Sequence, residues 1–200
     1  WTGDLPLEWE LLVVHTDSFN PLLHYDESSF SFELDLYQRT DLPLQFLYRA
    51  EIYTVAHDEV ALEFDAGDGF AHSLFVGKSG RDTIPSLGLG LVSDTREKRF
   101  NPHFGAYVEL SVAQFGGFLG GPADYQELLA DFRGDVPLVT GHILVLSALG
   151  QYRPGTMGAY DFFFVGGSNT MRAYANDVSN YGQHEVLTTA EYRLEFFERE

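Results

Sequence analysis

The chain has 200 residues, 44% of them hydrophobic, and a formal net charge of −18 at pH 7. This charge argues against nucleic acid as a partner, because nucleic-acid binding needs a basic surface. No apolar run approaches the ~18 residues of a spanning helix, so only a closed β-barrel could carry this composition across a bilayer. The chain contains no cysteine, which excludes disulfides and thiolate metal sites.

A period of two dominates the chain and predicts strands with one apolar and one polar face. Residues 7–15 are a first strand candidate with mixed faces. From Phe30 to Leu36, phenylalanine and leucine alternate with Ser31, Glu33 and Asp35. The same alternation recurs in residues 46–55, 59–65, 125–136 and 185–196, and residues 70–77 and 142–152 are weaker candidates.

Glycine and proline clusters separate these segments into about ten-residue units, the spacing of an outer-membrane barrel. We count nine or ten strands and predict an all-β fold, an antiparallel transmembrane β-barrel. Aromatic residues make up 15% of the chain, and many lie at strand ends, where barrels place their aromatic girdles. A soluble β-sandwich with an aromatic core is the alternative.

A polar motif follows the leucine row formed by Leu87, Leu89 and Leu91. Asp94 and Arg96 are two residues apart, so they project from one face, opposite to the leucines. If the leucines meet lipid, both charges face the barrel interior. The reverse phase would place the arginine against hydrocarbon at a cost of up to ~2–4 kcal/mol.

Two motifs in this chain resemble the bacterial surface-antigen superfamily of outer-membrane barrels, which includes BamA-like and TamA-like proteins. The first is the strand-turn-strand motif formed by Asp94, Arg96, Pro102 and Gly105. The second resembles the family's inward-folded loop and comprises Gly166, Gly167, Arg172 and Tyr174. The family places three strands between the motifs, and the sequence has three candidates, at residues 104–115, 125–138 and 142–152.

The resemblance implies that the loop around Arg172 folds into the barrel. We expect Arg172 to pin this loop to a carboxylate of the inner wall, because an unpaired buried charge is costly. Ala173 stands where the family usually has glycine, which leaves the loop less sharply turned. The candidate lumen carboxylates are Glu109, Asp131, Glu191 and Glu195.

The resemblance also implies that residues 1–200 form one barrel domain, incomplete at both ends, of a barrel with about sixteen strands. We find no nucleophile elbow, zinc-protease motif or phosphate loop, and therefore predict no enzyme activity, no cofactor and no metal site.

The function implied is an assembly or translocation factor that inserts or exports proteins at the outer membrane of a Gram-negative bacterium. Its partners would be outer-membrane lipid, client outer-membrane or secreted proteins, periplasmic POTRA domains and accessory lipoproteins. One alternative is the membrane anchor or pore of a larger protein with an upstream passenger or lipase-like domain. Another is a soluble all-β binding module.

Overall fold

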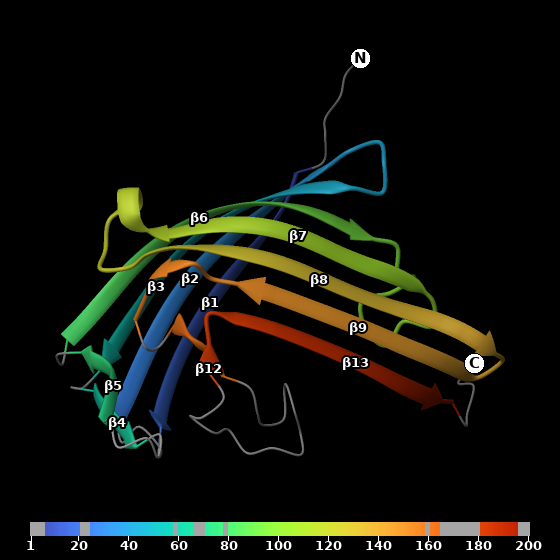
Figure 1. Ribbon diagram of the computed structural model, residues 1–200. Helices are drawn as coiled ribbons and strands as arrows, with labels where there is room; N and C mark the ends of the chain where they lie inside the picture. The colour runs from blue at the N-terminus through green and yellow to red at the C-terminus, as the bar shows by residue number, and fades with distance from the viewer. Residues whose placement is uncertain are drawn as a thin grey trace.

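The computed structural model describes residues 7–20, 25–57, 60–65, 71–77, 80–158, 161–164 and 181–195. A single curved antiparallel sheet dominates the fold (Figure 1). Nine strands form this sheet, in the order β1-β2-β3-β6-β7-β8-β9-β13, with the short β10 paired to β8. Their bounds are β1 (Leu7–Asn20), β2 (Tyr25–Arg39), β3 (Gln45–His57), β6 (Gly80–Asp94), β7 (Gly105–Gly116), β8 (Asp124–Val139), β9 (His142–Tyr152), β10 (Gly155–Thr156) and β13 (His184–Leu194).

Each long strand pairs with the next long strand along the chain, so the sheet is a meander. The predicted all-β antiparallel fold is confirmed, and the three strands expected between the two motifs are β7, β8 and β9. Within the described residues, β1 and β13 each have one neighbour, and the sheet is not closed. The chain therefore builds part of a barrel wall.

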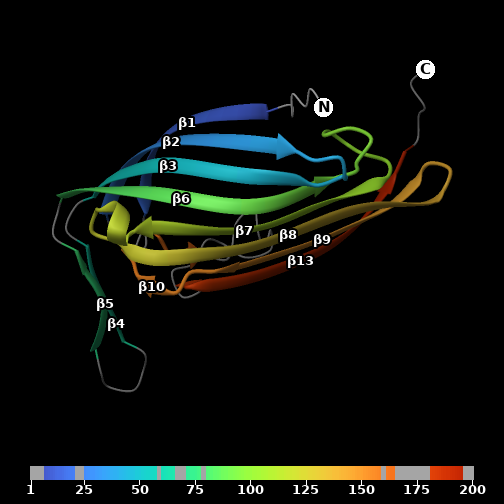
Figure 2. The same ribbon diagram turned by 90° about the horizontal axis from the view of Figure 1, so that it is seen from above.

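Two short strands lie outside this wall. β4 (Val60–Asp65) and β5 (Ala71–Gly77) pair only with each other and project from the sheet (Figure 2). Both segments are strands as predicted, but they do not belong to the wall. With six and seven residues, they are shorter than the roughly 9–11 residues of a spanning strand. β3 and β6 pair with each other as far as His57 and Gly80, so the hairpin is an insertion at the edge of the wall.

The remaining described elements are small. The 3-10 helix η1 (Gly117–Leu119) lies between β7 and β8, and β11 (Phe163–Phe164) pairs with β12 (Tyr181–Gly182). In the part of the chain that the structure describes, no helix has the length and apolar character needed to cross a bilayer.

The two faces of the sheet have opposite chemistry. The outer face exposes its apolar rows; Leu87 is 51% exposed and Leu89 is 58% exposed. The inner face buries acidic side chains, which are Asp35, Glu109, Glu127, Asp131 and Asp135. A soluble sandwich would bury the leucine rows against a second sheet, so this arrangement rules out that alternative and fits a barrel with a polar interior.

Gly105 begins β7 in a left-handed conformation, with φ of 111°. A Cβ atom there would lie 2.6 Å from the Arg96 Cα and from the Thr95 carbonyl oxygen. We expect Gly105→Ala to lower the free energy of unfolding by about 1–3 kcal/mol, measured by urea titration of the refolded barrel. Gly150→Ala is the matched control, because its Cβ would meet nothing within 4 Å. Equal stability of the two variants would contradict the assigned strain.

Candidate functional site in the barrel interior

Arg49 is the centre of a charge cluster on the inner wall. β3 places it directly opposite Asp35 of β2, and its guanidinium donates to both carboxylate oxygens, from Nε at 2.9 Å and from Nη2 at 2.8 Å. Glu33 lies 3.5 Å from Nε, and Glu109 of β7 lies 4.0 Å from Nη1. One arginine therefore compensates carboxylates from two other strands.

A glycine in β6 makes this reach possible. Gly88 pairs with Arg49 on one side and with Ala113 of β7 on the other. A Cβ at Gly88 would lie 3.5 Å from the Arg49 Cβ and 3.2 Å from the Ala113 Cβ, so even a methyl group there would require Ala113 to shift by a few tenths of an ångström. The guanidinium can therefore pass over β6 toward Glu109.

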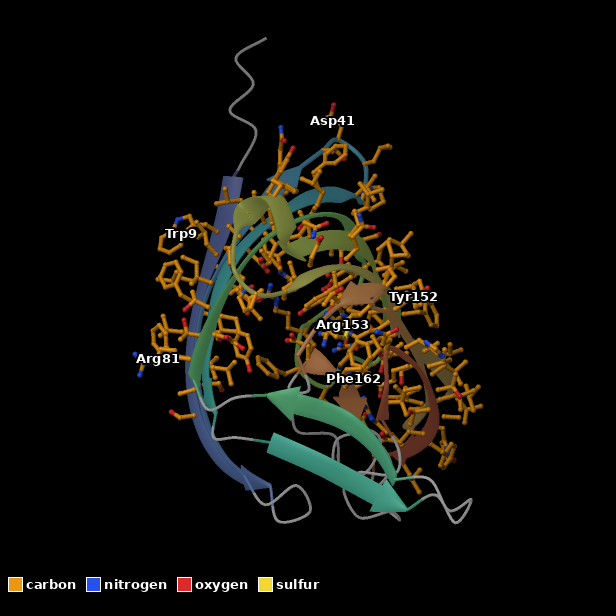
Figure 3. The ribbon with its side chains drawn as sticks, turned by 60° about the vertical axis from the view of Figure 1, so that its left-hand side comes forward. Trp9, Asp41, Arg81, Tyr152, Arg153 and Phe162 are labelled. Atoms are coloured by element: carbon orange, nitrogen blue, oxygen red, sulfur yellow. The ribbon has the colours of Figure 1, made fainter. Side chains whose placement is uncertain are left out.

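Arg153 forms a second centre, where the chain leaves β9. Its Nε donates to Glu127 of β8 at 2.6 Å, and its Nη1 donates to the Asp161 carbonyl at 2.6 Å. The Arg153 backbone N–H donates to the Gln183 carbonyl at 2.7 Å. One residue thus contacts the barrel wall and both described arms of the long β9–β13 connection. Figure 3 shows Arg153 and Phe162 inside the curve of the sheet and Tyr152 outside it.

An aromatic floor supports this second centre. Phe115 and Tyr125 stack with their ring centroids 4.7 Å apart, and they belong to a buried cluster with Ile84. The Arg153 guanidinium lies 4.1 Å from the centre of the Phe163 ring, a cation–π contact. We call Arg153, Glu127, Asp161 and Phe163 the loop clamp, because they hold the start of the connection against the inner wall.

A polar cavity of ≈ 370 Å³ lies between the two centres and is lined by Glu33, Arg49, Glu51, Glu127, Arg153 and Asp161, among others. Among the described residues, no group of three or more histidine or acidic side chains is arranged to hold a metal ion. Fixed charges of both signs can instead hold polar protein segments inside the barrel.

Asp94 and Arg96 form an ion pair with each other. Arg96 donates to both Asp94 carboxylate oxygens, at 2.8 Å and 2.7 Å, and its guanidinium lies 4.9 Å from the centre of the Tyr107 ring. These hydrogen bonds raise the pKa of Arg96. Pro102 is buried within the turn that follows. The motif therefore forms the end of β6 and the turn that leads into β7.

Each of the four candidate carboxylates has a partner within the described residues. Glu109 accepts from the Tyr107 hydroxyl at 2.5 Å, and Asp131 pairs with Arg133 at 2.6 Å. Glu191 pairs with Arg193 at 3.3 Å, and Glu195 meets His103 at 2.9 Å; these two are more exposed than Glu109 and Asp131. The loop motif of Gly166, Gly167, Arg172 and Tyr174 lies outside the described residues, so its predicted role stays a prediction.

Sequence reasoning missed Arg153 because Pro154 and Gly155 mark it as part of a turn. One signal was available: Arg153 continues the inward phase of Gln151 along β9. Glu127 was placed on the polar face of its strand, but the sequence alone offered no way to choose its partner.

Comparison with known proteins decides the family. The sequence matches the Omp85 superfamily domain over residues 9–199. The chain belongs to the Omp85 superfamily. The sequence-based recognition of an outer-membrane assembly and translocation barrel family is therefore confirmed.

The fold of this Omp85 chain is similar to a solved structure described as the crystal structure of BamA from Haemophilus ducreyi lacking POTRA domains 1–3. The TM-score is 0.62 at 14% sequence identity, over 85% of this chain and 34% of the other. The chain thus spans about a third of that structure, and the likeness concerns the fold. Comparison with curated proteins gave no match.

Proposed function

We propose that this Omp85 chain is part of a barrel that inserts or exports proteins at the outer membrane of a Gram-negative bacterium. The support is the family membership together with a wall that is apolar outside and charged inside. Such a barrel acts physically rather than by bond chemistry, since an exposed strand edge can pair with an incoming client strand.

The observation that carries this proposal is the loop clamp. A barrel that serves only as an anchor needs a stable wall. The clamp, in addition, joins both described arms of a long connection to the wall through Arg153, which pairs with the buried Glu127 and donates to carbonyls of both arms. The described arms of the connection, held against the inner wall, are placed to contact a client that passes through or beside the lumen. The proposed partners are outer-membrane lipid, client outer-membrane or secreted proteins, upstream POTRA domains and accessory lipoproteins.

The test uses the full-length protein reconstituted in lipid vesicles. A urea-unfolded outer-membrane barrel is added as client, and its folding is followed by heat-modifiable mobility and protease resistance. We expect client folding to be faster than in vesicles that hold an unrelated porin. In parallel, cells depleted of the protein should lose outer-membrane or secreted clients while their other envelope proteins remain.

Client folding at the rate of porin vesicles, combined with normal client levels in depleted cells, would contradict the proposal. If a domain of the same polypeptide were then the only material delivered to the cell surface, the protein would be a membrane anchor or exit pore for its own passenger.

A further inference from the structure

The connection between β6 and β7, residues 95–104, contacts a strand that is not its neighbour; we call it the mouth turn. His103 Nε2 lies 2.9 Å from a Glu195 carboxylate oxygen, just past β13. Arg193 of β13 also donates from Nη1 to the Asn101 side-chain oxygen at 3.5 Å. Because β8 and β9 lie between β7 and β13, the mouth turn must reach across them. In Figure 1 this green connection is turned in beneath β8 and β9.

Contacts within the mouth turn orient the His103 side chain. The Glu97 carboxylate accepts from the His103 backbone N–H at 3.0 Å and lies 2.8 Å from its Nδ1. The imidazole ring is thereby oriented between two carboxylates, one in its own turn and one on β13. Asn101 takes a left-handed φ of 49°, a conformation that asparagine tolerates better than most residues. The contacts with Glu97 thus fix the orientation of the His103 ring within the turn.

Both β13 and β1 contact the mouth turn. Arg193 is oriented by Asp135 of β8, 3.3 Å away, whose side chain is 4% exposed. At the opposite end of the strand order, Arg99 of the turn lies 3.3 Å from Glu10 of β1. A segment that touches both edges of the described sheet lies across the opening between them.

We infer that the mouth turn is a partial plug that narrows the lumen at the barrel end formed by the connections 40–44, 95–104 and 140–141. The His103–Glu195 contact is the latch that keeps it in place. This inference rests on the barrel fold and is independent of whether the protein assembles clients. Movement of the turn away from β13 would open a wider path for ions.

The test measures single-channel conductance of the full-length protein in planar bilayers. We expect His103→Ala and Glu195→Ala each to raise the conductance, roughly twofold, and the double variant to raise it no further, because both residues serve one contact. His142→Ala is the matched control. His142 lies at the same end of the barrel, but on the outer face, where its ring contacts Tyr192. We expect this control to conduct as the wild type does.

Conductance at the wild-type level in both single variants would overturn the plug. A double variant whose increase is the product of the two single increases would overturn the latch, since the residues would then act separately. Heat-modifiable mobility reports whether each variant is folded. Should an alanine variant fail to fold, His103→Leu serves instead: leucine fills a similar volume but has no donor for either carboxylate, and unchanged conductance there would refute the inference equally.

Discussion

Replacing Arg49 with alanine is expected to cost about 3–5 kcal/mol of unfolding free energy, because it leaves buried carboxylates without their cation. The side chains of Asp35 and Glu109 are 7% and 11% exposed, so water compensates them poorly. Arg49→Lys keeps the charge but loses the two-pronged contact with Asp35, and should fall between wild type and Arg49→Ala. Urea titration of the refolded full-length barrel measures all three.

The control for this experiment is Arg133→Ala. Arg133 also projects from the inner face and also pairs with an aspartate, Asp131, at 2.6 Å. Its side chain is 57% exposed, however, and an exposed pair contributes at most about 1 kcal/mol. If Arg49→Ala destabilised the barrel no more than Arg133→Ala, the wall would not depend on the Arg49 cluster.

Replacing Arg153 with alanine is expected to release the β9–β13 connection from the wall while the sheet stays folded. Hydrogen bonds that involve a charged group contribute about 1.5–3 kcal/mol each, so losing two of them should raise protease cleavage within residues 153–183 at least about tenfold. The rate of client folding in vesicles should be lower for this variant as well. Limited proteolysis of the folded full-length protein measures the first effect, with Arg133→Ala again as control.

A double variant distinguishes an effect on the stability of the barrel from an effect on the position of the connection. Glu127→Leu combined with Arg153→Met removes both charges of this pair, whose side chains are 11% and 20% exposed. Replacing both members of such a largely buried pair by apolar residues is often neutral or favourable for stability. This barrel should unfold at nearly the wild-type urea concentration, yet its connection should be cleaved as quickly as in Arg153→Ala. Wild-type cleavage rates in both variants would show that the loop clamp does not position the connection.

The sequence by itself determined where most strands lie and which way they face. Alternation is a local property, since neighbouring side chains on a strand point to opposite faces. The alternation in residues 30–36, 125–136 and 185–196 therefore predicted strands without knowledge of their partners. The Asp94–Arg96 pair was placed on one face for the same reason. The two motifs and their order along the chain indicated the family.

Only the tertiary structure decided which strands form the wall and which charges meet. Apolar and polar residues alternate in 59–65 and nearly so in 70–77, as they do in the wall strands. β4 and β5 nevertheless lie outside the wall, because β3 pairs directly with β6 and the two short strands pair only with each other. Arg153 reads as a turn residue and becomes a clamp only when β8 brings Glu127 within 2.6 Å. Strand register places side chains from distant segments side by side, and a linear pattern of residues does not specify that register.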